Sequence, residues 1–285
     1  MFQVEKSYKM YNGVSIPSIG YGTWKITDPQ VGIRAMREAI EVGYRHLDSA
    51  QGYGNEETLG EAIRQSGIDR KELFITGKVL NSSKGYESTL QAFDQTLKNL
   101  GTDYLDLYLI HWPKTKDTLD TYRELNRQTW KAFEKLYDEG LVRAIGVSNF
   151  HKPYLEELLS DNINIKPMMD QIEIHPHYFE RETIEFAKAN DMLVSGYSPL
   201  MRGGQLEDPV FVKLAQKHGK TPAQVVLRWA LQKGTIPLPK TVTRERMISN
   251  LDVYGFQLDQ DDMAILDAQH RADGKIGSHP DHTKF

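Results

Sequence analysis

The strongest constraint on the fold is a pattern that repeats along most of the chain: a short apolar run, then a loop, then an amphipathic stretch with helical spacing. Stretches of the last kind, such as residues 30–43, 86–101 and 221–234, end on a Gly, which is common just past the end of a helix. Strands that alternate with helices in this way are typical of a parallel sheet. The eight predicted strands are residues 18–22, 44–48, 73–78, 104–111, 142–148, 166–171, 192–198 and 235–240.

Eight strand–helix units in 285 residues predict an α/β fold, the (β/α)8 or TIM barrel, with an open doubly wound sheet as the weaker alternative. No flexible linker interrupts the series, so we expect residues 1–285 to form a single domain. Ahead of the first strand, Asn12-Gly13 between two β-prone runs predicts a hairpin with a type I′ turn. The polar residues 271–285 are expected to form an irregular extension that folds over one mouth of the barrel.

Composition excludes several classes of function. The chain has no Cys, which rules out disulfides, thiolate nucleophiles and Cys-ligated zinc. Its net charge of −4, without any block of Lys or Arg, argues against nucleic acid and anionic membranes as partners. The N-terminus lacks an apolar leader and no apolar run has the length of a membrane span, so we expect a cytoplasmic protein.

Polar residues stand at the ends of the predicted strands. In a barrel of this kind the C-terminal ends of all strands meet at one face, where the chemistry of such folds takes place. A lone His at a strand end is more often structural than catalytic, but here several polar residues would share one face. They are Asp48, Lys78, His111, Ser148 with Asn149, Gln171, Tyr197 with Ser198, and Lys240.

Four residues form a candidate acid–base group. Tyr53 follows Asp48 in the next loop, and a nearby Lys78 ammonium would favour its phenolate and lower its pKa. Asp48 would hold Lys78 through a salt bridge, and His111 would orient a bound carbonyl group. Such a group can protonate an oxygen atom while another species attacks the carbon.

The species that attacks the carbonyl carbon is best explained as a group supplied by a cofactor. The chain has neither a Cys nor a G-x-S-x-G motif to supply a nucleophile, and the close His pairs His175/His177 and His279/His282 lack further ligands, so no metal site is predicted. A hydride from a nicotinamide cofactor would suit a group that donates a proton.

A phosphate site is predicted at the last strand, because no G-x-G-x-x-G motif follows the first one. Lys240, Thr241, Arg244 and Arg246 gather near the start of a helix, which is the usual phosphate site of this fold. Several cations together favour a 2′-phosphate, hence NADPH over NADH. The alternative for Arg244 is that it only decorates a solvated helix.

These motifs together resemble the aldo-keto reductase family over nearly the whole chain. The matching motifs are GYRHLDSAQGYGNE, ITGK, LDLYLIHWP, GVSNF, QIEIHPHY, YSPL and IPLPKT…RERMISN. The sequence is most similar to bacterial members that reduce 2,5-diketo-gluconate, methylglyoxal and related small carbonyls. The resemblance implies a monomeric NADPH-dependent reductase of aldehydes, ketoaldehydes or ketones, in which Tyr53 is the general acid of a tetrad with Asp48, Lys78 and His111.

The resemblance also implies residues that bind the cofactor and the substrate. Ser148, Asn149 and Gln171 would hold the nicotinamide carboxamide, and Tyr197 would stack on its ring. The substrate pocket would use Trp24 and Trp112, together with Tyr53, His111 and the C-terminal loop. The remaining implied cofactor residues are Ser198 and Leu200 along the pyrophosphate, and Lys240, Thr241, Arg246 and Asn250 at the adenosine phosphate.

The chain departs from the family at a few positions. The family more often has Thr-Lys-Leu-Trp where this chain has Gly77-Lys78-Val79-Leu80, so that Leu80 replaces an aromatic residue of the pocket. Thr241 stands where Ser is commoner, and Ser249 replaces a frequent acidic residue near the adenine. Because some barrels of this family hold NADPH with little turnover, a regulatory, nucleotide-sensing barrel is the alternative function.

Overall fold

The computed structural model describes residues 5–283 and 285, in which eight parallel strands form one sheet and pair in the order of the sequence. Backbone hydrogen bonds close this sheet into a barrel, because the N–H groups of Gly20 and Gly22 donate to Pro237 O and Pro239 O at 3.0 and 3.1 Å. The (β/α)8 prediction is confirmed, and the open doubly wound alternative is wrong. The strands are β3 (Tyr21–Gly22), β4 (His46–Asp48), β5 (Phe74–Val79), β6 (Leu107–Ile110), β7 (Ile145–Ser148), β8 (Met169–Glu173), β9 (Leu193–Tyr197) and β10 (Ile236–Leu238).

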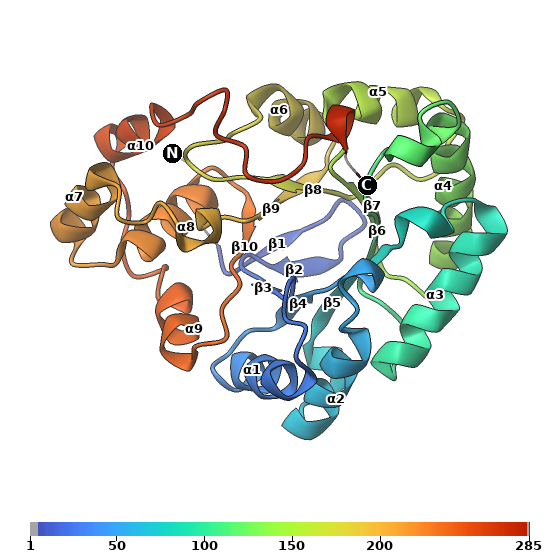
Figure 1. The fold of residues 1–285 in the computed structure, drawn as a ribbon, viewed down its shortest axis with the longest axis horizontal. Helices are drawn as coiled ribbons and strands as arrows, with labels where there is room; N and C mark the ends of the chain where they lie inside the picture. Colours follow the sequence, from blue (N-terminus) through green and yellow to red (C-terminus); the bar gives the residue numbers. More distant parts are fainter. Residues whose placement is uncertain (1–4, 284) are drawn as a thin grey trace.

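Helices surround the barrel and cover its outer face (Figure 1). Two of them, α7 and α10, lie outside the strict alternation of strand and helix, since α7 shares the β9–β10 connection with α8 and α10 follows α9. None of the helices in the described part of the chain has the length and apolar character needed to span a membrane. The helices are α1 (Pro29–Glu41), α2 (Glu56–Ser66), α3 (Tyr86–Leu100), α4 (Tyr122–Asp138), α5 (Lys152–Ser160), α6 (Arg181–Ala189), α7 (Pro209–His218), α8 (Pro222–Gln232), α9 (Arg244–Leu251) and α10 (Gln260–Asp267).

Local sequence explains where these helices begin. At α1, Asp28 accepts a hydrogen bond from Val31 N at 2.9 Å, and Pro29 occupies the first turn, where its missing N–H is not needed. At α8, Thr221 and Gln224 form a reciprocal capping box. Such caps satisfy N–H groups that the first helical turn leaves without partners.

The N-terminal hairpin is present, but its predicted turn type is wrong. Strands β1 (Ser7–Lys9) and β2 (Ser15–Pro17) pair antiparallel. Gly13 N donates to Met10 O, Met10 N donates to Val14 O, and only Gly13 of the loop has a positive φ, at 88°. A type I′ turn needs positive φ at two central residues, so this is the longer three-residue loop that ends in a left-handed glycine.

The hairpin plugs the N-terminal mouth of the barrel. Ile16 of β2 and Met10 of the turn are buried in one cluster with Phe74, Leu107 and Ile236, which begin three of the strands. A second and larger cluster lies between the sheet and the helices. Because the hairpin closes the N-terminal mouth, the opposite, C-terminal face is the open end of the barrel.

The C-terminal segment crosses that opposite face. In Figure 1 it runs from α10 past the ends of β9 and β8 toward β6. Its Ile276 N and Gly277 N donate to the buried carboxylate of Glu173, at the end of β8, at 2.6 and 2.8 Å. Its last residue, Phe285, accepts a hydrogen bond from Lys116 N at 3.0 Å. The predicted extension over one barrel mouth is thus observed.

A buried carboxylate ties three strand beginnings together at the closed end. Asp106, just before β6, accepts a hydrogen bond from Ile75 N of β5 at 2.9 Å. It also pairs with Arg70, ahead of β5, and with Arg143, ahead of β7, at 2.8 Å each. The Asp106 side chain is fully buried, so these partners compensate a charge that would otherwise be costly to desolvate.

We expect Asp106→Ala to lower the free energy of unfolding by about 3 kcal/mol, because it removes the acceptor of a buried N–H and the partner of two arginines. Urea unfolding followed by circular dichroism measures this loss. Asp103→Ala, at an exposed position three residues earlier, serves as the control and should stay within about 0.5 kcal/mol of wild type. Equal losses in the two variants would contradict the role of Asp106.

Candidate active site

A buried ion pair stands at the C-terminal ends of two neighbouring strands. Lys78 Nζ of β5 lies 2.6 Å from Asp48 Oδ1 of β4. The same ammonium donates to Ser49 O at 2.9 Å and to the Tyr53 hydroxyl at 3.3 Å. Tyr53 reaches it from a short 3-10 helix, Gln51–Tyr53, that follows β4. The three N–H groups of the ammonium therefore have three acceptors.

The other oxygen of Asp48 is also occupied. Gln171 Nε2, from β8 on the far side of the barrel, donates to Asp48 Oδ2 at 2.8 Å. Asp48, Lys78 and Gln171 are all buried. A buried ion pair is tolerated only when its remaining hydrogen-bonding groups are satisfied, and this pair meets that condition.

Tyr53 is held in its protonated form. Burial raises the pKa of Tyr53, and the ammonium of Lys78 offsets only part of that rise. The prediction that Lys78 brings this pKa below its ordinary value is therefore wrong, because desolvation of the phenolate outweighs the attraction. At neutral pH the side chain carries a proton that it can donate.

His111 lies beside Tyr53, with the two ring centres 5.6 Å apart in an edge-to-face arrangement. Burial and the nearby Lys78 charge lower the pKa of His111 to about 3. Its imidazole is therefore neutral at physiological pH and can both donate and accept a hydrogen bond. The structure brings together all four residues of the predicted acid–base group.

Four of the predicted nicotinamide residues form a hydrogen-bonded chain beside this group. Tyr197 hydroxyl donates to Asn149 Oδ1 at 2.7 Å, and Asn149 Nδ2 lies 3.1 Å from Ser148 Oγ. Ser148 Oγ in turn donates to Gln171 O at 2.8 Å. Asn149 has a φ of 62° and Ser198 one of 52°, and strained backbone of this kind is often found at binding sites.

The predicted phosphate residues lie at the end of β10 and on α9. Lys240 and Arg246 are exposed, and neither forms an ion pair with another residue of the described ranges. Arg244 differs, since it pairs with Glu41 of α1 at 2.9 Å, as expected for a residue that decorates the surface. Thr241 accepts a hydrogen bond from Thr243 N at 3.1 Å. Of the other two residues predicted for the cofactor, Asn250 is buried and Leu200 half-buried.

The predicted pocket residues lie on loops at the same face. The Trp24 side chain is 40% exposed, with the cations of Lys25 and Arg202 at 4.6 and 4.9 Å from the ring centre. Trp112 contacts the ring of Phe285, with centres 5.2 Å apart. Leu80, which replaces the family's aromatic residue, packs near His111, because a Cβ atom added at Gly52 would touch both.

Two charged residues of this face were not identified from the sequence. Glu173 holds the C-terminal segment, and its alternation with Gln171 on one strand is a signal that could have placed it on the same face. Lys84 is buried behind the loop that carries Trp112. No local pattern marks Lys84, because its partners lie 28 to 42 residues further along the chain.

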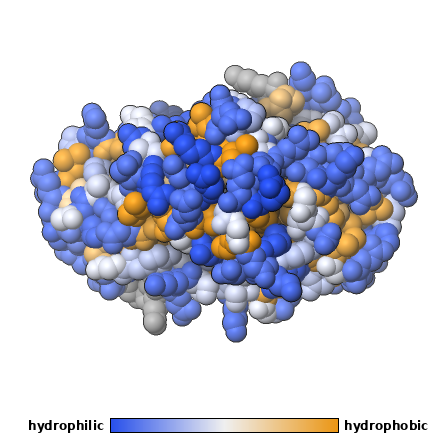
Figure 2. Space-filling model, turned by 90° about the horizontal axis from the view of Figure 1, so that it is seen from below, coloured by the Kyte–Doolittle hydropathy of each residue, from blue (hydrophilic) through white to orange (hydrophobic). Residues whose placement is uncertain are grey.

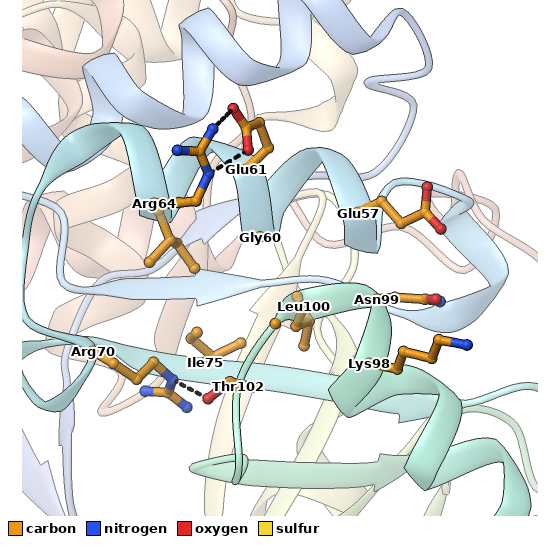
Figure 3. Close-up of a pocket in the computed structure, with 12 residues that line it drawn as sticks. Glu57, Gly60, Glu61, Arg64, Arg70, Ile75, Lys98, Asn99, Leu100 and Thr102 are labelled. Atoms are coloured by element: carbon orange, nitrogen blue, oxygen red, sulfur yellow. Dashed lines mark hydrogen bonds and ion pairs between the residues drawn. The ribbon is translucent and has the colours of Figure 1, made fainter.

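A separate cavity of about 390 Å³ lies between α2 and α3 (Figure 3). Within its lining Arg64 binds Glu61, and Arg70 donates to Thr102 Oγ1 at 3.0 Å. None of the four acid–base residues lines it. The described residues include no group of three His, Asp or Glu side chains that could hold a metal ion. The end of the barrel strands is therefore the candidate site.

Comparison with known proteins decides the family. Residues 18–271 match the model of the aldo/keto reductase family. The chain belongs to this family. The resemblance drawn from the sequence is confirmed, and with it the prediction of an oxidoreductase enzyme.

Individual relatives cover nearly the whole chain of this aldo-keto reductase. It is 44% identical over 282 residues to glyoxal reductase of Bacillus subtilis, covering 99% of each chain. It also resembles an aldo-keto reductase from a Medee basin deep-sea metagenome library, with 39% identity, a TM-score of 0.92 and coverage of 98% of this chain and 100% of the other. A variant of Gox0644 solved in complex with NADPH gives 38% identity, a TM-score of 0.91 and coverage of 99% and 100%.

We expect Lys78→Met to lower the free energy of unfolding by about 3–5 kcal/mol, because the carboxylate of Asp48 would stay buried without its cation. Urea unfolding of this variant, of Asp48→Asn and of the double variant completes a double-mutant cycle. The double variant should be more stable than Lys78→Met alone, since it leaves no isolated charge. Strictly additive losses would show that the two side chains do not act as a pair.

Proposed function

We propose that this aldo-keto reductase uses NADPH to reduce small aldehydes, ketoaldehydes or ketones to alcohols, with Tyr53 as the general acid. One observation carries the proposal: a protonated Tyr53 hydroxyl lies 3.3 Å from the Lys78 ammonium and beside the neutral imidazole of His111. A proton donor next to a fixed cation suits a reaction that turns a carbonyl oxygen into a hydroxyl group.

Each residue of the group has a distinct task in this mechanism. When bound, NADPH supplies the hydride that reaches the carbonyl carbon. Tyr53 gives its proton to the carbonyl oxygen, and Lys78 stabilises the phenolate that remains. Asp48 keeps Lys78 charged in its buried position, and the neutral His111 donates a hydrogen bond that orients the oxygen.

The residues at the cofactor positions fit a dinucleotide phosphate. Lys240 and Arg246 are exposed cations beside the first turn of α9, and neither has an ion-pair partner in the part of the chain that the structure describes. Such a group favours a phosphate. Asn149 and Gln171 offer amide groups to a carboxamide, and Tyr197 offers a ring near them. Ser198, Leu200, Thr241 and Asn250 would complete this binding surface. The complex of the Gox0644 variant with NADPH supports the same choice of cofactor.

The substrate class follows from the pocket and from the relatives. Trp24 and Trp112 bring aromatic surface to the mouth, while Leu80 and the C-terminal segment limit it. Glyoxal reductase is named for a small dicarbonyl, and this similarity supports methylglyoxal or 2,5-diketo-gluconate as candidate substrates. The alternative, a sensor that holds NADPH with little turnover, is not favoured, because binding alone would not require Tyr53.

We also propose a cytoplasmic monomer that forms one domain over residues 1–285 and binds no nucleic acid. The exposed large apolar side chains of the described residues are scattered singly over several elements, which supports a monomer. Figure 2 shows a face covered mainly by hydrophilic residues, with hydrophobic ones in small groups between them. The net charge of −4 offers no basic field to a polyanion.

We expect Tyr53→Phe to reduce kcat at least 100-fold and to leave NADPH affinity within about twofold, since only the proton donor is lost. The assay follows the loss of reduced-nicotinamide absorbance with methylglyoxal and then with a panel of small carbonyls. Fluorescence titration gives the affinity for NADPH. Turnover at the wild-type rate in this variant would show that Tyr53 is not the acid.

We expect Arg246→Ala to weaken NADPH binding by about tenfold or more while NADH binding changes little, because the guanidinium would contact the 2′-phosphate. Arg244→Ala is the matched control, since Arg244 is exposed on the same helix but already paired with Glu41. Titration of each variant with both cofactors makes the comparison. If Arg246→Ala weakened NADPH and NADH equally, the phosphate assignment would be lost.

A further inference from the structure

Lys84 is a buried lysine that has no ion-pair partner among the described residues. It lies between β5 and the start of α3, and only 6% of it is exposed. Its Nζ donates to Pro113 O and to Asn126 Oδ1, both at 2.7 Å, and to Trp112 O at 3.3 Å. All three acceptors are uncharged oxygens, and within the described residues Lys84 makes no ion pair. Burial lowers the pKa of Lys84 to about 7.

Desolvating a lysine without a partner carboxylate is unfavourable, and a neutral side chain could fill this volume at less cost. The arrangement is nonetheless specific, because three oxygens match the three N–H groups of an ammonium. The oxygens come from the β6–α4 loop and from α4, so Lys84 joins three segments at the open face of the barrel. This geometry suggests a function beyond packing.

The segment that Lys84 holds carries two residues of the proposed site. The carbonyl oxygens of three successive residues, 111 to 113, are each bound by a side chain. Asn149 Nδ2 donates to His111 O at 2.9 Å from the β7 side. Lys84 donates to Trp112 O and Pro113 O from the β5 side. The segment is thus fixed from both neighbouring units of the barrel.

We propose that Lys84 is a positioning residue for the carbonyl substrate: by fixing the backbone of Trp112 and Pro113, it sets how His111 and Trp112 face the bound carbonyl. The inference rests on the proposed function, because it assigns substrate contacts to these two side chains. Among the described residues, the side chain of Lys84 itself binds only Trp112, Pro113 and Asn126, none of which is proposed to bind the cofactor, so it should act on the carbonyl substrate and not on the cofactor.

The proposal makes the substrate pocket sensitive to pH. An ammonium donates three hydrogen bonds, whereas a neutral amine donates two and turns a lone pair toward the third oxygen. The loop is therefore fully held below pH about 7 and less firmly held above it. Around Lys84, Asn126 accepts from its ammonium, Ser88 donates to its backbone oxygen and Thr129 accepts from Gly85 N, and none of these groups titrates in this range. His111, on the segment that Lys84 holds, stays neutral throughout it, because its pKa is about 3.

The experiment measures kcat and KM for methylglyoxal from pH 6 to 8.5 in wild type, Lys84→Met, Asn126→Asp and the control Lys131→Met. Lys131 is an exposed lysine of α4. We expect Lys84→Met to lower kcat/KM by about 10- to 100-fold with NADPH affinity unchanged, since small misplacements of a substrate cost this much. We expect KM of the wild type to rise as the pH passes 7, and Lys84→Met to lack this rise.

Asn126→Asp keeps the shape of the site and places a carboxylate beside the ammonium, which should move the rise in KM to higher pH by about one unit or more. Circular dichroism would reveal whether Lys84→Met folds. If it does not, Asn126→Asp still tests whether Lys84 positions the substrate. Lys131→Met should behave as wild type.

The failure of this inference can be distinguished from the failure of the proposed function. The inference alone is overturned if the wild type reduces methylglyoxal but Lys84→Met keeps the wild-type kcat/KM. It is also overturned if the rise of KM in Asn126→Asp occurs at the same pH as in the wild type. A wild type that binds NADPH but reduces no carbonyl of the panel overturns the proposed function, and the inference falls with it.

Discussion

The ion pair between Lys78 and Asp48 is the interaction on which the site depends. It survives burial because the ammonium has three acceptors and both carboxylate oxygens have donors, at distances from 2.6 to 3.3 Å. Those partners come from β4, β5 and β8 and from the helix that carries Tyr53. Only a closed barrel can bring β8 against β4, so closure of the sheet and the chemistry of the site have the same origin.

The same burial determines the protonation of the neighbouring side chains. Low polarity disfavours any uncompensated charge, so it raises the pKa of Tyr53 and lowers that of His111 to about 3. Both groups are consequently neutral at physiological pH, and the charges of the centre are those of the compensated pair. A neutral acid beside a fixed cation is prepared to lose its proton without reorganisation of the surroundings.

The open face is shaped by side chains that bind backbone groups of distant segments. Glu173, at the end of β8, holds the N–H groups of Ile276 and Gly277. Burial alone would raise its pKa, but the hydrogen bond with His175, the charge of Lys275 and these two backbone hydrogen bonds outweigh it and lower the pKa to about 2. Gly277 permits this close approach, since a Cβ atom there would lie 2.7 Å from the Glu173 carboxylate. Lys84 acts similarly on Trp112 and Pro113. The mouth is thus held by specific polar contacts as well as by apolar packing.

The sequence by itself determined the strands, most helices and the barrel, and it predicted which polar residues gather at the strand ends, because periodicity and strand ends are local properties. The beginning of α4 at Tyr122 is not marked by apolar spacing, since its first turns bury a polar face through Asn126 rather than an apolar one. Tertiary structure alone decided the sign of the Tyr53 pKa shift and the contacts that Lys84 and Glu173 make. These depend on desolvation and on partners up to 104 residues away, which a local pattern cannot encode.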